Sequence, residues 1–278
     1  MYNEEQLYII IQYSMLNIPK IIFLVPFRNR DNEKFAYLSI MKSILEDYDN
    51  NYYKIYFIKQ LDNRMFNRGA IKNIGFNVIK NVYPNDYKNI TLVFNDIDVC
   101  PLDKSYIKDY STTVGKIKHF YGFTFALGGI VSITGEDFEK IGGFINNWGW
   151  GFEDNHLNDI AKIYNIVIDR SVFYEKGSKK MLDIYHGNYK YINNSEIKKA
   201  VRKIKEYDNL KTLKNINYTI ENENYFNWNN ENTIYNVNVN KFDTLINYTN
   251  TKNDYRKHDL NNGNKVYERN IGLKMKFV

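Results

Sequence analysis

The chain has 278 residues, of which 44% are hydrophobic, and its formal net charge at pH 7 is +6. This size allows one large domain with a full core, and the scattered lysines do not form the basic blocks typical of a nucleic-acid-binding protein. The single cysteine, Cys100, excludes an intrachain disulfide, so a reducing compartment suits the protein. The first residues are acidic and the apolar patch at 7–16 is interrupted, so we expect a cytoplasmic protein with no signal peptide or membrane span. Because the lysines are scattered, we expect no nucleic-acid partner.

Short strands and amphipathic helices are predicted to alternate in the first part of the chain. Residues 21–25 form an apolar run that Pro26 is expected to end, and residues 53–58 and 92–94 form two more. The apolar residues between these runs follow helical spacing: Phe35, Leu38, Met41 and Leu45, and then Ile71, Ile74, Gly75 and Val78. This alternation predicts an α/β fold with a doubly wound, Rossmann-like sheet and flanking helices.

The second part predicts a mixed continuation of the sheet. A strand at 130–133 runs into Thr134, which is suited to cap a short helix that ends at Gly142. A helix from Asp154, a strand at 166–168, a basic helix at 197–207 and strands at 213–220 and 233–239 follow. We expect an N-terminal extension (1–19), one main domain (20–240) and a polar C-terminal tail (241–278).

Charged side chains of both signs follow the first three predicted strands: Arg28 and Arg30, Arg64 and Arg68, and Asp96 and Asp98. In doubly wound sheets ligands bind beyond the carboxyl ends of the strands, so we expect these loops to converge. Arginine forks bind phosphate oxygens and carboxylates hold hard cations, which suits a nucleotide diphosphate with its metal. Each group also has a plainer interpretation, as a solvated arginine or as an aspartate in a turn.

A polar loop at 147–158 combines indoles, glycines and adjacent carboxylates. Trp148 and Trp150 are suited to stack on a sugar face, although core packing is the alternative. Glu153 and Asp154 suit acid/base chemistry, although acidic residues in the first turn of a helix also favour its dipole.

Five motifs, taken in order, resemble the β-1,4-galactosyltransferase family over residues 20–186. They are Pro26-Phe27-Arg28-Asn29-Arg30, Phe66-Asn67-Arg68-Gly69-Ala70, Asn95-Asp96-Ile97-Asp98, Gly128-Gly129-Ile130-Val131-Ser132 and Trp148-Gly149-Trp150-Gly151-Phe152-Glu153-Asp154. The resemblance implies a GT-A fold and an inverting transfer from a UDP-sugar to a saccharide hydroxyl. It also implies a manganese ion, with magnesium as the alternative.

The resemblance also implies roles for individual residues. Asp154 corresponds to the general base, and Glu153 to a residue that holds sugar hydroxyls. Asp98 corresponds to a metal ligand, His186 is placed to be a second, and Asp183 stands where the family commonly has a methionine ligand. A histidine that caps a strand end is the plainer interpretation of His186. Donor contacts are implied for the remaining motif residues: Pro26, Phe27, Arg28, Arg30, Phe66, Arg68, Asp96, Gly129 and Trp150.

Several positions depart from the family pattern. Phe152 and Asn155 flank the Glu-Asp pair where the family usually has a glycine and an acid, which indicates a changed acceptor side. Ala126 or Leu127 stands where the family often has a bulky aromatic that crowds the donor sugar. The predicted donor is therefore UDP-galactose or UDP-N-acetylgalactosamine, and the acceptor a saccharide or glycoconjugate. The alternative is a UDP-sugar-binding protein without turnover.

Three histidines are not assigned to the site. We expect His119 and His258 to be surface residues, because neither has the sequence context of a metal ligand. His156 lies within one turn of Asp154 and could orient it, but we expect a surface histidine of the helix.

Overall fold

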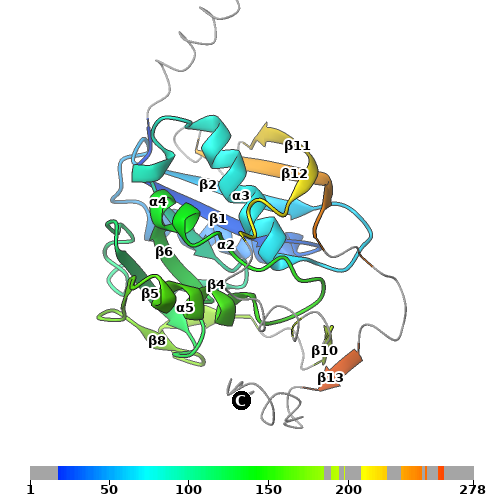
Figure 1. The fold of residues 1–278 in the computed structure, drawn as a ribbon. Coiled ribbons are helices and arrows are strands. Elements are labelled where there is room, and N and C mark those ends of the chain that lie inside the picture. Colours follow the sequence, from blue (N-terminus) through cyan, green and yellow to red (C-terminus); the bar gives the residue numbers. More distant parts are fainter. Residues whose placement is uncertain are drawn as a thin grey trace, which may run out of the picture.

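The computed structural model describes residues 18–184, 189–193, 197, 208–223, 233–245, 248 and 256–259. The strands of its main sheet are β1 (Ile21–Phe27), β2 (Tyr53–Gln60), β3 (Thr91–Asn95), β5 (Lys116–Gly122), β6 (Ile130–Thr134), β7 (Val167–Asp169), β8 (Tyr174–Glu175), β11 (Lys214–Asn222) and β12 (Ile234–Asp243). They are ordered β11-β12-β2-β1-β3-β6-β5-β7, and β8 also pairs with β5 (Figure 1).

The centre of the sheet is parallel and buried on both faces. β1 lies between β2 and β3 and runs parallel to both. α2 (Asp31–Ile44) connects β1 to β2, and α3 (Arg68–Val82) lies between β2 and β3 in the chain. Ile22 and Leu24 of β1 belong to one core cluster, whereas Phe23 and Val25 belong to the other. Because side chains of a strand alternate between faces, the two clusters lie on opposite faces of the sheet, and the predicted doubly wound arrangement is confirmed.

The helices cover the two faces unequally. α3 lies in front of the sheet in Figure 1, together with α4 (Gly135–Lys140) and α5 (Glu153–Ile163), while α2 lies behind it. Ile71, Ile74, Gly75 and Val78 of α3 are buried as predicted, because they form the stripe that faces the sheet.

Pro26 does not end the first strand, and that expectation was wrong. β1 continues to Phe27, and Pro26 pairs with Ile58 of β2. On the other side the pairing of β1 with β3 stops at Leu24. Pro26 therefore has a strand neighbour on one side only, which is a position where a proline is tolerated.

The buried face of α2 is turned slightly from the predicted one. Phe35 is 49% exposed, whereas Tyr37, Leu38 and Met41 are buried. The expectation for Phe35 was wrong because Tyr37, one turn before Met41, occupies the place against Phe57 of the sheet.

The second part of the chain makes the sheet mixed, as predicted. β6 runs antiparallel to β3 and to β5, and β7 runs parallel to β5. Thr134 caps α4, since its hydroxyl accepts a hydrogen bond from the amide of Asp137.

The C-terminal strands complete the other edge. β12 pairs in parallel with β2, and β11 pairs with the outer side of β12. The boundary expected after residue 240 falls inside β12, which continues to Asp243. Within the expected tail, β13 (Arg256–Asp259) pairs with β10 (Tyr189–Ile192). The expected extension lies almost wholly outside the described residues, as does the basic helix at 197–207 except for residue 197.

Three short elements complete the described fold. The short strands β4 (Val99–Pro101) and β9 (Met181–Asp183) pair with each other just after the Asp96 and Asp98 loop. A 3-10 turn, η1 (Tyr87–Asn89), precedes β3. Within the described ranges, no helix has the length and apolar character needed to cross a membrane.

Candidate functional site

Arg68, the first residue of α3, joins three acidic side chains at the carboxyl edge of the sheet. One guanidinium nitrogen lies 2.7 Å from Oδ2 of Asp154 and also contacts Glu153, while the other contacts Asp96. Asp96 follows β3, and the other two acids begin α5. The structure thus brings a basic loop and an acidic loop together, as the position of both loops after parallel strands predicts.

The start of α3 also holds the loop that precedes α5. Asn73 bonds both backbone groups of Phe144: its Nδ2 donates to the carbonyl at 2.7 Å, and its Oδ1 accepts from the amide at 2.9 Å. A Cβ atom on Gly69 would lie 2.0 Å from the carbonyl oxygen of Ile145, so only glycine permits this close approach. Helix α3 therefore fixes where α5 and its two acids begin.

Asp154 is enclosed by cations and by glycine. The ammonium of Lys72 lies 2.9 Å from Oδ1, and the Lys72 side chain is only 2% exposed. A Cβ atom on Gly128 would lie 2.5 Å from Oδ2, so the Gly128-Gly129 pair leaves the space that this carboxylate occupies. The amide of Leu127 donates to the Asp154 carbonyl at 2.9 Å, which ties α5 to the entrance of β6.

The two adjacent acids differ in their affinity for a proton. Burial would raise the pKa of Asp154, but Arg68 and Lys72 together hold that pKa below its ordinary value. For Glu153, burial and the neighbouring charge of Asp154 raise the pKa above its ordinary value. At neutral pH, Asp154 can therefore accept a proton as an ionised carboxylate, while its neighbour Glu153 becomes protonated more readily.

Lys72 was not among the residues predicted for the site. A lysine in a helix is usually solvated, which hid it among the polar residues of α3. The available signal was its spacing, since Arg68 and Lys72 are four residues apart and therefore share one face of the helix.

Asp98 lies among other carboxylates. Burial, the charge of Asp96 and, more weakly, that of Asp183 raise the pKa of Asp98 to about 6. The pairing of β4 with β9 places Val99 opposite Asp183, and the amide of Ile184 donates to the Asp98 carbonyl at 3.0 Å. Asp183 in turn pairs with Lys176 and accepts a hydrogen bond from the Tyr121 hydroxyl.

Of the three predicted metal ligands, the structure describes Asp98 and Asp183. His186 lies outside the described residues, and within the described ones no three His, Cys, Asp or Glu side chains are grouped to hold a metal. Half-buried carboxylates that repel one another are nevertheless the hard oxygen donors that Mn²⁺ or Mg²⁺ requires, so Asp98 fits such an ion. The metal roles of Asp98, Asp183 and His186 stay predictions.

The arginines of the first two loops have different surroundings. Arg28 donates to the carbonyl of Arg64, which joins the loop after β1 to the loop after β2. Arg64 pairs with Asp62 and lies over the ring of Trp148, at 4.4 Å from its centroid. Arg30 pairs with Glu33 in the first turn of α2, at 2.9 Å. The structure therefore links Arg28 to the edge loops, while Arg30 belongs to the start of a helix.

The two tryptophans separate into core and surface. Trp148 is 2% exposed and stacks on Phe242 of β12, with ring centroids 5.3 Å apart, and its Nε1 donates to Thr244. Trp148 therefore cannot be a sugar platform, and that expectation was wrong. Trp150 is 38% exposed and stands between Gly149 and Gly151, whose φ angles of 89° and 101° suit glycine.

The other expected donor contacts are partly buried. Phe27 is buried and packs on Phe57 of β2, next to buried Pro26. Phe66 is half-buried against the core cluster that includes α3. Gly129 has a φ of 73°, and a Cβ atom there would lie 2.3 Å from the Tyr121 carbonyl oxygen. Their donor contacts stay predictions.

Two histidines are buried, contrary to expectation. Nε2 of His119 lies 2.9 Å from the carbonyl of Tyr121 and 3.1 Å from that of Gly128, while Nδ1 accepts from Arg170. Burial and Arg170 lower the pKa of His119 to about 4. Burial alone lowers the pKa of His156 to about 4. The side chain of His258 lies outside the described residues.

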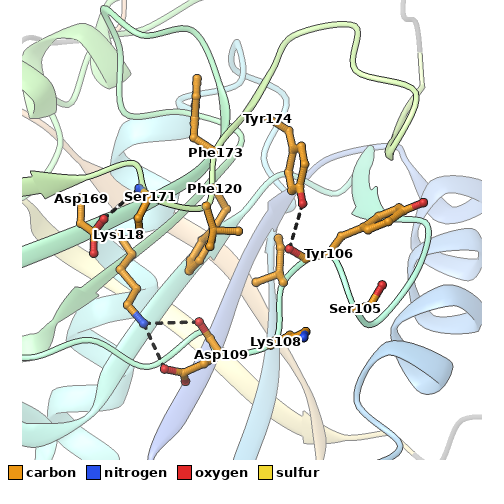
Figure 2. A pocket seen from close by; sticks show the side chains of 12 residues that line it. Ser105, Tyr106, Lys108, Asp109, Lys118, Phe120, Asp169, Ser171, Phe173 and Tyr174 are labelled. Atoms are coloured by element: carbon orange, nitrogen blue, oxygen red, sulfur yellow. Dashed lines mark hydrogen bonds and ion pairs between the residues drawn. The ribbon is translucent and has the colours of Figure 1, made fainter.

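A pocket of about 410 Å³ lies apart from the Arg68 cluster, between β5, β8 and residues 105–109 (Figure 2). Its polar groups pair with one another: Lys118 with Asp109 at 3.0 Å, and the hydroxyl of Tyr174 with the carbonyl of Tyr106 at 3.1 Å. None of its lining residues belongs to the predicted site.

Two sequence profiles match consecutive parts of the chain. Residues 15–110 match the N-terminal region of glycosyl transferase group 7, and residues 108–186 match the N-terminal domain of galactosyltransferase. The match covers every described motif of the site.

Individual relatives are similar over half of the chain or more. Beta-1,4-galactosyltransferase 7 of Drosophila melanogaster is 26% identical over 62% of this chain and 54% of its own length. Beta-1,4-galactosyltransferase 5 of Mus musculus is 29% identical over 72% of this chain and 52% of its own length. The chain thus spans about half the length of these relatives.

The fold is that of a solved catalytic domain. The crystal structure of Drosophila beta1,4-galactosyltransferase 7 with xylobiose has a TM-score of 0.62 and 21% identity, and the match covers 80% of this chain and 94% of that chain. A mutant of the same domain was solved with manganese, UDP-Gal and xylobiose. This likeness shows the GT-A fold.

Proposed function

Because the chain belongs to the β-1,4-galactosyltransferase family, we propose that it is a metal-dependent, inverting glycosyltransferase. It moves galactose or N-acetylgalactosamine from a UDP-sugar to a hydroxyl of a saccharide or glycoconjugate. One observation carries the proposal: the Asp154 carboxylate is only 19% exposed, and Arg68 and Lys72 contact its two oxygens, at 2.7 Å and 2.9 Å, and lower its pKa. A half-buried, ionised carboxylate at the ligand edge of such a sheet is suited to remove a proton.

The proposed reaction assigns a task to each charged residue of the cluster. The acceptor oxygen attacks the anomeric carbon from the side opposite UDP, and its proton passes to Asp154. The bond from that carbon to UDP breaks, and its electron pair leaves on the diphosphate oxygen. Arg68 and Arg28 stabilise the charge that develops there. Glu153, whose pKa is raised, holds sugar hydroxyls.

Asp98, with Asp183 and His186 as predicted partners, would hold manganese or magnesium. The support is the half-buried position of Asp98 near Asp96 and Asp183, whose charges raise its pKa. When bound, such an ion supplies positive charge against the leaving diphosphate. The manganese in the Drosophila complex with UDP-Gal supports the choice of metal.

The donor proposal depends on the segment before Gly128. Leu127 is 0% exposed and belongs to the core cluster, whereas Ala126 lies outside that cluster and is 6% exposed, so Ala126 is the candidate to border the donor sugar. A methyl group there leaves more room than an aromatic ring, which supports an N-acetylated donor beside galactose. The xylobiose of the Drosophila complex supports a saccharide acceptor. The cytoplasmic location stays a prediction that cell fractionation would test.

The experiment measures UDP release from a panel of UDP-sugars with mixed saccharide acceptors, with manganese or with EDTA. We expect release from UDP-galactose or UDP-N-acetylgalactosamine that EDTA abolishes. Asp154→Asn should slow release by about 10²–10⁴-fold, the usual contribution of a positioned base, while UDP-sugar binding survives. Asp159→Asn, the same change further along α5, should keep nearly full activity.

Two outcomes would contradict the proposal. Acceptance of glucose or mannose alone would refute the donor assignment. Tight UDP-sugar binding without release from any donor would favour the alternative, a sugar-nucleotide-binding protein without turnover.

A further inference from the structure

Lys72 is an unusual lysine for a soluble protein. Its side chain is 2% exposed, its ammonium lies 2.9 Å from Oδ1 of Asp154, and the ring of Phe144 lies 4.3 Å from that ammonium. Burying a charge is costly unless a partner of opposite charge compensates it. Asp154 is that partner for the buried ammonium of Lys72.

The two cations that hold Asp154 are not equivalent. Arg68 is shared with Asp96 and Glu153, and it stands where the proposed reaction needs a partner for the diphosphate. Lys72 is one helical turn deeper along α3, on the opposite oxygen of the Asp154 carboxylate. A ligand that draws Arg68 away therefore leaves Lys72 in contact with Asp154.

The other surroundings of Asp154 carry little compensating charge. Glu153 on the same helix is acidic, and Gly128 at the entrance of β6 offers no side chain. His119 of β5 lies behind Gly128 and is neutral at physiological pH, because burial and Arg170 lower its pKa to about 4.

We propose that Lys72 is a positioning residue, which orients the Asp154 carboxylate and keeps it ionised while Arg68 binds the donor's diphosphate. This inference rests on the proposed function, since it assigns Asp154 the task of accepting the proton. It adds a residue that acts through the base and does not touch the substrate.

Lys72→Met tests the proposal, because methionine keeps an unbranched apolar side chain in the buried site and removes the charge. We expect kcat to fall about tenfold or more at pH 6 and less at pH 8.5, because Asp154 then protonates more readily. The KM for the UDP-sugar should stay near the wild-type value. Lys72→Arg should restore much of the wild-type pH profile, and Lys72→Gln serves as the uncharged variant if the methionine form does not fold.

Lys80→Met is the matched control. Lys80 lies two turns further along the same helix, pairs with Glu139 and has the ring of Tyr87 at 5.2 Å, but it is 42% exposed and remote from Asp154. We expect this variant to keep the wild-type pH profile.

A second measurement needs no turnover. The titration of the Asp154 carboxyl carbon is followed by NMR in the ligand-free protein and assigned by comparison with Asp154→Asn. The midpoint should move to higher pH in Lys72→Met and stay in place in Lys80→Met. An unchanged midpoint with an unchanged pH profile would overturn the proposal. A wild-type chain that transfers no sugar would refute the proposed function, and the midpoint would still decide whether Lys72 holds Asp154 ionised.

Discussion

At the scale of single residues, burial decides which chemically suitable side chains can take part in a reaction. Trp148 and Trp150 have nearly identical sequence surroundings, yet one lies in the core and the other is partly exposed. The difference arises because Phe242, far away in the sequence, stacks on Trp148. No local pattern contains that information. The carboxylates were easier to predict, since their place directly after a strand or at the start of a helix fixes where they lie.

His156 gives a prediction about pH and stability. Its buried ring has a pKa of about 4, against about 6.5 in an unfolded chain, and its Nδ1 has no hydrogen-bond partner among the described residues. Below pH 6.5 the unfolded chain therefore binds a proton that the folded chain binds only near pH 4. Stability should fall over this window, by about 2 kcal/mol between pH 7 and 5 for this histidine alone.

The measurement is the free energy of unfolding in urea at several pH values. His156→Leu should flatten part of the decline below pH 6.5, and His119 should account for a further part. Parallel curves for the variant and the wild-type protein would show that His156 is protonated equally in the folded and unfolded states.

At the scale of elements, α3 organises the site because one face of its first two turns carries Arg68, Gly69, Lys72 and Asn73. The helix itself was predictable from the spacing of its apolar residues. Its contacts with the loop before α5 were not, because they join polar side chains to backbone groups, which leave no periodic signal in the sequence. Similarly, the continuation of β1 through Pro26 depends on where its pairing with β3 stops.

Asn73→Ala tests the clamp between α3 and this loop. The change leaves the buried amide and carbonyl of Phe144 without their partner, and each such group costs about 1–3 kcal/mol. We expect the unfolding free energy to fall by at least about 2 kcal/mol, and activity to fall as the start of α5 loosens. Asn77→Ala, at a half-buried position of the same helix, is the control and should change stability much less. Equal losses in both variants would argue against the clamp.

At the scale of the whole molecule, the C-terminal strand β12 supports the site from a distance. It pairs with β2 and presents Phe242 to Trp148, and the guanidinium of Arg64 lies 4.7 Å from the Phe242 ring centroid. The strand at 233–239 was predicted from the sequence, but its parallel pairing with β2 was not, because strand order depends on contacts between remote segments. The expected boundary at residue 240 divided an element that the sheet keeps whole.

Phe242→Ala should therefore weaken both the fold and the Trp loop. Truncation of a buried phenylalanine costs about 3–5 kcal/mol, and loss of the stack should let Trp148 and the following residues shift. We expect a lower unfolding temperature together with a lower rate of UDP release. Phe35→Ala is the control, since that ring is 49% exposed and should contribute little. A stable Phe242→Ala protein with full activity would show that β12 does not support the loop.

The position of β12 also affects how the protein folds during translation. The apolar strand β2 is made early, but its neighbour on one side, residues 234–239, emerges only after most of the chain has been translated. Until then β2 exposes an unsatisfied edge that can pair with another nascent chain. We therefore expect a long-lived, aggregation-prone folding intermediate during synthesis. The yield of folded protein in cells should then depend on chaperones and on the speed of translation.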